Sequence, residues 1–335
     1  MPSEIVKDAE KADIVKAVGA CAFAVTDSNV ARLYPDVTAG AFVIEAGEKS
    51  KTPGTLFRII EAMHEKRLKR GDTVAAIGGG VVGDITGLAS AIYMRGVAWI
   101  NVPTTLLAMI DAGIGGKTAV DFCGVKNLVG AFHEPKTVFI GTEFLDTLPE
   151  REWVCGTGEL IKTCVLRGDA YETLYTELGG FRVKKAESVG RLVRLCVDIK
   201  SDVVASDPTE KGVRKILNVG HTVGHALESI DGFRSSHGEY VMKGMLTEAA
   251  MCDDMIDKKF FGELTSILGM YVRPPRTTAK AVCELAASDK KNEGDTVTLM
   301  IPCAPADIKE VRLTQTEFVS RYDAALRRLK DGANG

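Results

Sequence analysis

The stretch Thr73-Val-Ala-Ala-Ile-Gly-Gly-Gly-Val-Val-Gly-Asp84 predicts the fold of the N-terminal half of the chain. Its apolar run, residues 73–77, is typical of a buried strand, and glycines at 78, 80 and 83 follow it and open an amphipathic segment. Glycines at such a turn let backbone amides approach a diphosphate at a helix N-terminus, where the helix dipole favours negative charge. The pattern favours a dinucleotide-binding turn, and the alternative is a tight strand-to-helix turn without a ligand.

Outward from this stretch, short apolar runs alternate with amphipathic segments over the first 150 residues. The expected strands are 22–25, 41–44, 73–77, 97–102 and 137–140, and the expected helices are 52–67, 82–94 and 106–112. This alternation predicts a parallel sheet covered on both faces. The glycine turn departs from the usual fingerprint, because it follows the third expected strand and Asn101 stands near the place of a ribose-binding acid. Asp27, at the end of the first expected strand, is the better candidate for a ribose contact.

Three of the five histidines, His221, His225 and His237, fall within residues 214–237. On a helix with about 100° per residue, Arg214, Asn218, His221 and His225 would share one face, opposite an apolar face. Gly220 and Gly224 each cost a helix about 1 kcal/mol relative to Ala, which favours close packing as compensation. This stretch predicts a metal site or an anion site; the alternative is a set of ordinary surface or core histidines.

Composition limits the classes of function. The 335 residues, 45% hydrophobic and 26% charged, are enough for two domains with a sizeable core. A net charge of −3 gives no support for a general nucleic-acid or membrane partner. No apolar run approaches eighteen residues and the N-terminus lacks the shape of a signal peptide, so we expect a cytoplasmic protein. None of the eight cysteines forms a Cys-x-x-Cys pair, so any metal would be held mainly by His and carboxylate.

Two further segments are typical of anion binding. Residues 101–105, Asn-Val-Pro-Thr-Thr, give an expected strand the polar end that lines a ligand crevice. Residues 111–118 and then Lys126-Asn127 place two lysines and an amide in glycine-rich surroundings. Residues 111–118 are not a Walker A loop, because Asp111 occupies the position of the first glycine of that motif. Phosphate or carboxylate binding is therefore favoured over nucleotide hydrolysis.

From residue 151 onward long helical patterns dominate, and 296–301 is the one expected strand. Leu148-Pro-Glu150 is a plausible boundary. We therefore predict an α/β nucleotide-binding domain with a parallel sheet over residues 1–150 and a mainly α-helical metal- and substrate-binding domain over 151–335. Spacing alone favours exposed, solvated positions for the Glu159–Lys162 pair, for Lys200 and for the turn containing Lys290 and Lys291.

In this order the motifs resemble those of the 3-dehydroquinate synthase family, from about Phe23 to Ile301. They are Gly47-Glu-Lys-Ser-Lys51, Gly78-Gly-Gly-Val-Val-Gly-Asp84, Tyr93-Met-Arg-Gly96, Pro103-Thr-Thr-Leu-Leu107, Gly115-Gly-Lys-Thr118, Lys126-Asn127, Leu148-Pro-Glu-Arg151, Glu159-Leu-Ile-Lys162, Gly220-His-Thr-Val-Gly-His225, His237-Gly-Glu239 and Asp289-Lys-Lys291. Each motif is modest evidence alone, and together in register they are highly specific.

The resemblance implies NAD, one divalent metal (zinc or cobalt), a phosphorylated keto-acid sugar substrate and a homodimer. It implies Glu159, His221 and His237 as metal ligands and His225 as an acid/base. With the glycine turn, the expected cofactor contacts are Asp27, Glu48, Lys49, Lys51, Gly80, Val81, Val82, Gly83, Asp84, Thr104, Thr105, Lys117 and Lys126. The implied substrate contacts are Asp111, Lys117, Asn127, Lys162, Lys200, Arg214, Asn218 and one of Lys290 and Lys291. Arg95 resembles an arginine that reaches a phosphate across the dimer interface.

The implied reaction converts 3-deoxy-D-arabino-heptulosonate 7-phosphate to 3-dehydroquinate and phosphate, with NAD regenerated. Departures at Val125, Thr163 and Lys243 remove no matched ligand or base. They leave related cyclases of sedoheptulose 7-phosphate or glucose 6-phosphate as an alternative. The sequence also leaves open a metal- and NAD-dependent polyol dehydrogenase and a catalytically silent homologue that acts as a binding or scaffold subunit.

Overall fold

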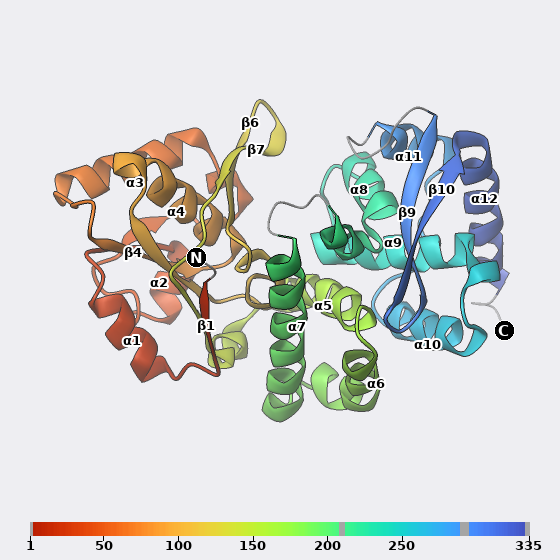
Figure 1. Cartoon of the computed structure of the whole chain (residues 1–335), viewed down its shortest axis with the longest axis horizontal. Coiled ribbons are helices and arrows are strands. Elements are labelled where there is room, and N and C mark those ends of the chain that lie inside the picture. The colour runs from red at the N-terminus through yellow and green to blue at the C-terminus, as the bar shows by residue number, and fades with distance from the viewer. Residues whose placement is uncertain (1–2, 208–211, 289–294, 332–335) are drawn as a thin grey trace. The chain divides into compact units, whose positions relative to one another are not determined.

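The computed structural model describes residues 3–207, 212–288 and 295–331 (Figure 1). Contacts divide the chain into two compact units. Unit 1 comprises Met1–Trp153 and Gly180–Pro208, and unit 2 comprises Val154–Gly179 and Thr209–Gly335. The sequence predicted a single boundary at residue 150 and did not include the return of residues 180–208 to the first unit.

Unit 1 is built on a parallel sheet of six strands in the order β1-β8-β5-β4-β2-β3. The strands are β1 (Glu4–Lys7), β2 (Phe23–Asp27), β3 (Phe42–Ile44), β4 (Thr73–Gly78), β5 (Ala98–Pro103) and β8 (Thr137–Ile140). The predicted parallel sheet is confirmed, and its five expected strands correspond to β2, β3, β4, β5 and β8. The edge strand β1 was missed, because its four residues are only partly buried and carry no continuous apolar run.

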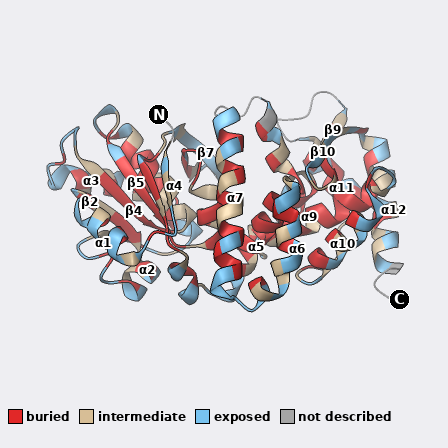
Figure 2. Cartoon of the chain, turned by 60° about the horizontal axis from the view of Figure 1, so that its bottom comes forward, coloured by how far each residue is buried: buried red, intermediate tan, exposed pale blue. Residues whose placement is uncertain are grey.

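Helices cover this sheet and bury its central strands. They are α1 (Lys11–Gly19), α2 (Ser28–Leu33), α3 (Pro53–Glu65), α4 (Gly80–Ile92) and α7 (Ala186–Ser206). Figure 2 shows the central strands β4 and β5 in the colour of buried residues. Val74 and Ala76 of β4 belong to the same buried core of unit 1 as Ile85 and Leu88 of α4. The expected helix at 106–112 is confirmed, and its residues from Ala108 to Ala112 form a π-helical turn, η3. Thr105 precedes this turn and accepts a hydrogen bond from the N–H of Ala108 at 3.2 Å.

An antiparallel hairpin of β6 (Lys117–Phe122) and β7 (Val125–Phe132) extends from unit 1 (Figure 1). All side chains of β7 except Ala131 are exposed. The sequence did not predict this hairpin, because its glycine-rich flanks were interpreted as anion-binding loops.

Unit 2 is mainly helical, as predicted. Its elements are α5 (Glu150–Val165, from residue 154), α6 (Gly168–Arg182, to residue 179), η5 (Val213–Asn218), α8 (His221–Ile230), α9 (His237–Met251), η6 (Asp253–Met255), α10 (Lys258–Gly269), α11 (Ala279–Ala287), β9 (Thr296–Ala304), β10 (Asp307–Thr314) and α12 (Gln315–Asp331). The expected strand at 296–301 corresponds to β9, which pairs with an unexpected β10. Within the described ranges, no helix combines the length and apolar character that crossing a bilayer requires.

The single amphipathic helix expected around residues 214–230 is wrong. A 3-10 helix, η5, ends at Asn218, and a separate helix, α8, begins at His221. Gly220 between them has φ of 74°, a left-handed conformation that interrupts an α-helix and that glycine adopts without steric cost. Arg214 and Asn218 therefore do not share a helix face with the histidines.

Candidate active site

Glycines let the helices that carry the site in unit 2 approach very closely. A Cβ on Gly158 of α5 would lie 2.3 Å from the carbonyl oxygen of Gly238 of α9. One on Gly238 would lie 1.9 Å from the carbonyl oxygen of Cys155. One on Gly224 of α8 would lie 2.9 Å from the carbonyl oxygen of Tyr240. The close packing expected at Gly224 is confirmed, and each of these three glycines is a chain neighbour of Glu159, His237 or His225.

One carboxylate oxygen and two imidazole nitrogens converge where these helices meet. Glu159 Oε1 lies 3.4 Å from Nε2 of His221 and 3.3 Å from Nε2 of His237. His225 lies beside them on α8, with its ring centroid 5.0 Å from that of His221 and 5.7 Å from that of His237. The three histidines each offer a nitrogen within 4.8 Å of the others. The structure thus brings together the three predicted ligands and places exposed His225 at the margin of the cluster.

The two histidine ligand candidates are oriented by hydrogen bonds at the other ring nitrogen. His221 Nδ1 lies 3.1 Å from the carbonyl oxygen of Val219, and His237 Nδ1 lies 3.1 Å from Glu228 Oε2. A carbonyl can only accept, so the proton of His221 resides on Nδ1 and leaves Nε2 facing Glu159. Such a second contact is typical of metal-ligating histidines.

Electrostatics prepare the cluster for a cation. Burial alone would raise the pKa of Glu159, but the Lys162 ammonium and the hydrogen bond with His237 hold it well below its usual value. Burial and the neighbouring Lys162 lower the pKa of His221, although Glu159 opposes them. Burial acts against protonation of His237, yet hydrogen bonds with Glu159 and Glu228 raise its pKa to about 10. The cluster therefore holds a carboxylate, a neutral imidazole and one imidazolium proton that a metal would displace.

These residues fit a divalent metal. The separations of 3.3 and 3.4 Å match the distance of about 3.3–3.4 Å between ligand atoms placed tetrahedrally at about 2.0–2.1 Å from zinc. Two histidines and one carboxylate are also a ligand set of catalytic zinc, with an open position for substrate oxygen.

Several predicted charged residues are buried, which spacing alone did not indicate. Glu159 and Lys162 form an ion pair with side chains 1% and 2% exposed, so the exposed-pair interpretation is wrong. Lys200 is also buried, and it pairs with Asp111 within unit 1. Arg214 is buried in unit 2. Asn218 is half-buried, and its Nδ2 donates to the carbonyl of Lys215 at 3.1 Å. Lys290 and Lys291 lie outside the described residues.

The predicted cofactor turn lies at the carboxyl ends of β4 and β5. The N–H of Thr104 donates to the carbonyl of Gly78 at 2.9 Å, which places the turns after the two strands side by side. A Cβ on Gly78 would lie 2.5 Å from Cγ2 of Val82, so the turn requires glycine there. Gly80, Val81, Val82, Gly83 and Asp84 form the first turns of α4. This edge of a parallel sheet is where nucleotides bind in related architectures.

Lys51 connects this turn to the hairpin. Its Nζ lies 2.5 Å from Asp84 Oδ2 and 2.5 Å from Asn127 Oδ1. Burial raises the pKa of Asp84 to about 6, although the Lys51 ammonium opposes the shift. Asn127, expected at the substrate, is therefore joined to a predicted cofactor contact.

The remaining predicted contacts are more peripheral. Glu48 and Lys49 are exposed on η1 (Glu48–Ser50), and Lys117 and Lys126 are exposed on the hairpin. Asp27 Oδ1 accepts the N–H groups of Asn29 and Val30, so its position is explained as the N-cap of α2. Arg95 is exposed in a strained corner with φ of 66°.

Glu228 and Glu248 were missed. Glu228 orients His237, and Glu248 is buried beside the start of α8. Their signal in the sequence was a carboxylate within an apolar helical segment, as in Met245-Leu-Thr-Glu-Ala-Ala-Met251. Such a carboxylate is costly to bury without partners.

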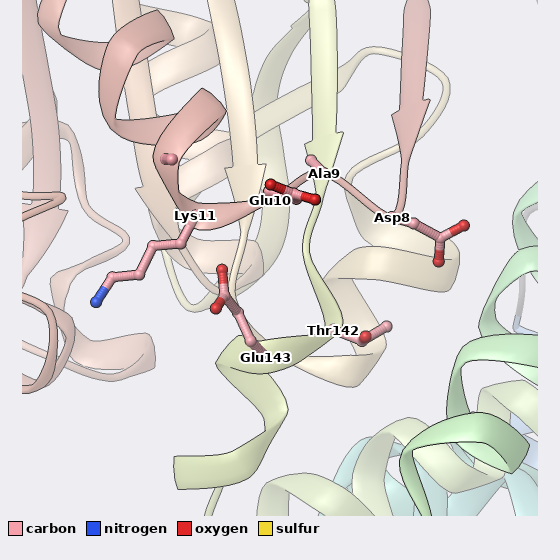
Figure 3. A pocket seen from close by; sticks show the side chains of 7 residues that line it. Asp8, Ala9, Glu10, Lys11, Thr142 and Glu143 are labelled. Carbon is pink, nitrogen blue, oxygen red and sulfur yellow. The ribbon is translucent and has the colours of Figure 1, made fainter.

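A separate cavity of about 450 Å³ lies in unit 1 between the start of α1 and the segment after β8 (Figure 3). Asp8, Glu10, Lys11 and Glu143 are among its lining residues. Asp8 pairs with Arg194 at 2.8 Å and Lys11 with Asp36 at 2.7 Å. None of the predicted site residues lines it, and Asp8 and Lys11 are engaged in surface ion pairs.

A parallel sheet with a glycine turn, together with a buried carboxylate–histidine cluster, defines a class of metal-dependent enzymes with a dinucleotide-binding architecture. The 3-dehydroquinate synthase N-terminal family matches residues 41–155, and the 3-dehydroquinate synthase C-terminal family matches residues 156–292. The 3-dehydroquinate synthase of Alkaliphilus metalliredigens is 36% identical over 311 residues, covering 88% of this chain and 87% of that protein. The chain belongs to the 3-dehydroquinate synthase family.

Solved structures of related cyclases share the fold. The 2-epi-5-epi-valiolone synthase of Streptomyces hygroscopicus subsp. jinggangensis, with NAD+ and Zn2+ bound, has a TM-score of 0.87 and 25% identity, covering 99% of this chain and 97% of that one. A 2-deoxy-scyllo-inosose synthase with carbaglucose-6-phosphate, NAD+ and Co2+ has a TM-score of 0.81 and 22% identity, covering 97% and 96%. The second likeness shows the fold alone.

Proposed function

We propose that the chain is a 3-dehydroquinate synthase that converts 3-deoxy-D-arabino-heptulosonate 7-phosphate to 3-dehydroquinate and phosphate. The observation that carries the proposal is the convergence of Glu159 Oε1 on Nε2 of His221 and His237. Family membership supports the choice of reaction, because curated relatives at 34–38% identity over most of the chain carry this name. We place the enzyme in the cytoplasm.

The chain's own residues have defined tasks in this proposal. Glu159, His221 and His237 hold a zinc or cobalt ion, which when bound makes substrate hydroxyls easier to deprotonate. Lys162 and Arg214, both buried cations of unit 2, offer charge to a substrate that carries a carboxylate and a phosphate. His225 accepts a proton and returns it, because its imidazole is exposed next to His221.

NAD is the proposed cofactor, and it supplies a hydride acceptor that is regenerated within the reaction. The turn from Gly80 to Asp84 receives the diphosphate at the N-terminus of α4. Lys51, Thr104 and Thr105 complete the cofactor contacts, and the lysine's pairing with Asp84 positions it at the turn.

A homodimer is the proposed assembly. Phe122, Val125, Leu128, Val129 and Phe132 of the β6–β7 hairpin are each at least 43% exposed, an apolar surface that is costly to leave in water. Exposed Arg95 is proposed to reach a phosphate in the partner subunit.

A cyclase of sedoheptulose 7-phosphate or glucose 6-phosphate is the second candidate. The likeness to the 2-epi-5-epi-valiolone synthase favours it, with a TM-score of 0.87. The departures from the family pattern at Val125, Thr163 and Lys243 leave this second substrate class open.

The proposal is tested by incubating the purified chain with NAD, zinc and each of the three sugar phosphates in turn. We expect phosphate and dehydroquinate from the heptulosonate phosphate alone, no net NADH, and no product when NAD is omitted. Chelation is expected to abolish turnover, and added zinc or cobalt to restore it. Product from another sugar phosphate would establish the second candidate, and NADH accumulation without phosphate would indicate a polyol dehydrogenase.

The His225→Ala substitution tests whether His225 is an acid/base or a metal ligand. We expect zinc content to persist while turnover falls by about 10²–10⁴-fold, the usual contribution of a positioned acid/base. His64→Ala, at the end of α3 in unit 1, is the matched control and leaves both unchanged. Loss of zinc from His225→Ala would instead make His225 a ligand, a role that its nitrogen's distance to the other histidines permits.

A further inference from the structure

Both histidines of the proposed metal site are the first residues of their helices. α8 begins at His221 and α9 begins at His237. A helix N-terminus carries roughly half a positive charge on its unpaired N–H groups. A divalent cation held by these two residues therefore lies where helix dipoles disfavour it, unless negative charge is placed at both helix starts.

The two helix starts obtain that charge in different ways. In α9 the carboxylate comes from its own first turn, because Glu239 Oε2 accepts the N–H of Ser236 at 2.8 Å in a capping box. In α8 the N-cap is Gly220, which has no side chain to cap with. The charge has to come from another part of the chain.

Glu248 of α9 supplies it. Its Oε2 accepts the N–H of Gly220 at 3.1 Å, and its Oε1 accepts the N–H of Val223 at 2.8 Å. The side chain is fully enclosed, with the residue 1% exposed. Glu248 thus holds the backbone on both sides of His221.

The surrounding packing keeps this clamp rigid. A Cβ on Gly244 would lie 1.9 Å from the carbonyl oxygen of Gly220, so α8 and α9 touch one turn before Glu248. Thr222 Oγ1 donates to the carbonyl of Thr298 at 2.9 Å and ties the same segment to β9. The backbone that carries His221 is therefore held by α9 and β9, and these contacts set the direction of its imidazole.

We propose that Glu248 is a positioning residue whose two hydrogen bonds to the backbone beside His221 fix this histidine for the metal. The inference rests on the proposed metal site and goes beyond it, because Glu248 touches neither metal nor substrate. Burial raises the pKa of Glu248 to about 8, and the N–H groups of Val223 and Gly220 oppose this shift.

The test measures the zinc dissociation constant of the full chain, stripped of metal, by competition with a chelating dye. Glu248→Gln keeps the shape but loses the charge and one of the two acceptors. We expect it to bind zinc about 10–100-fold more weakly, as changes behind metal-ligating histidines do. Its dissociation constant for NAD should equal that of the unchanged chain. Glu248→Asp keeps the carboxylate but has a shorter reach, so its zinc dissociation constant should lie between those of the unchanged chain and of Glu248→Gln. If Glu248→Gln does not fold, the zinc affinity of Glu248→Asp tests the proposal.

Glu317→Gln is the matched control. Glu317 Oε2 accepts the N–H of Thr314 at 2.8 Å, so it caps α12 without a neighbouring histidine. We expect wild-type zinc affinity from this variant.

Each outcome decides a different claim. Unchanged zinc affinity in Glu248→Gln, or equal weakening in Glu317→Gln, overturns the inference. An unchanged chain that binds no zinc overturns the proposed metal site and this inference with it. Zinc binding without cyclase turnover overturns only the proposed reaction, because the inference is read from affinities.

Discussion

We expect Glu159→Gln to bind no zinc and to lose turnover by more than about 100-fold. Substituting a residue that only hydrogen-bonds to a metal ligand costs up to about 100-fold, and Glu159 is a proposed ligand itself. The amide cannot supply the anionic oxygen on which both Nε2 atoms converge at 3.3 and 3.4 Å. Lys162 also loses its buried counter-charge, and breaking a buried ion pair costs about 3–5 kcal/mol of unfolding free energy. Metal content by mass spectrometry and urea unfolding of the metal-free chain measure the two effects.

Glu284→Gln provides the comparison for Glu159→Gln. Glu284 pairs with Lys280 on α11 at 4.0 Å, and both side chains are largely exposed. Its removal should leave zinc content, turnover and the denaturation midpoint unchanged. One zinc per chain in Glu159→Gln would show that the carboxylate is not a ligand.

Gly238→Ala is expected to destroy the metal site without touching any charged group. The added Cβ would lie 1.9 Å from the carbonyl oxygen of Cys155, so α5 and α9 must separate. Overpacking of this kind costs about 1–3 kcal/mol or more. Because Gly238 is adjacent to His237, the separation should also weaken zinc binding, as measured by chelator competition.

Gly262→Ala is the control for that substitution. Gly262 lies inside α10, and a Cβ there would meet no atom within 4 Å. Replacing glycine by alanine in an open helix position stabilises by about 0.5–1 kcal/mol. The two substitutions should therefore change stability in opposite directions, and a stabilised Gly238→Ala with intact zinc affinity would contradict the packing argument.

The sequence predicted the parallel sheet well because its central strands are continuous apolar runs. The run at 73–77 became β4, fully enclosed except at its first residue. The glycines after it were also informative, since the steric contact between Gly78 and Val82 is local. Strand β1 and the β6–β7 hairpin carry no comparable pattern, because β1 is short and partly buried and β7 is exposed along nearly its whole length.

The burial of the site could not be read from spacing. Glu159 and Lys162 have the i,i+3 separation that is common in exposed ion pairs. The close approach of α5 and α9 at Gly158 and Gly238 is a contact between residues far apart in the sequence, so spacing along one helix could not reveal it. The break at Gly220 was missed for a related reason. Apolar periodicity continues across Gly220, while the need for glycine there comes from Met245 and Val241 of another helix, which leave no room for a side chain.

The path of the chain between the two units affects how the protein folds during synthesis. Unit 1 includes α7, whose Lys200 and Asp198 pair with Asp111 and Lys7 from the first part of the chain. Residues 154–179 of unit 2 therefore leave the ribosome before the N-terminal unit is complete. Glu159 has its ion-pair partner Lys162 on the same helix, but the two histidines that complete the cluster come only with α8 and α9. The cluster, and with it the proposed zinc site, can therefore assemble only after residue 237 has been made.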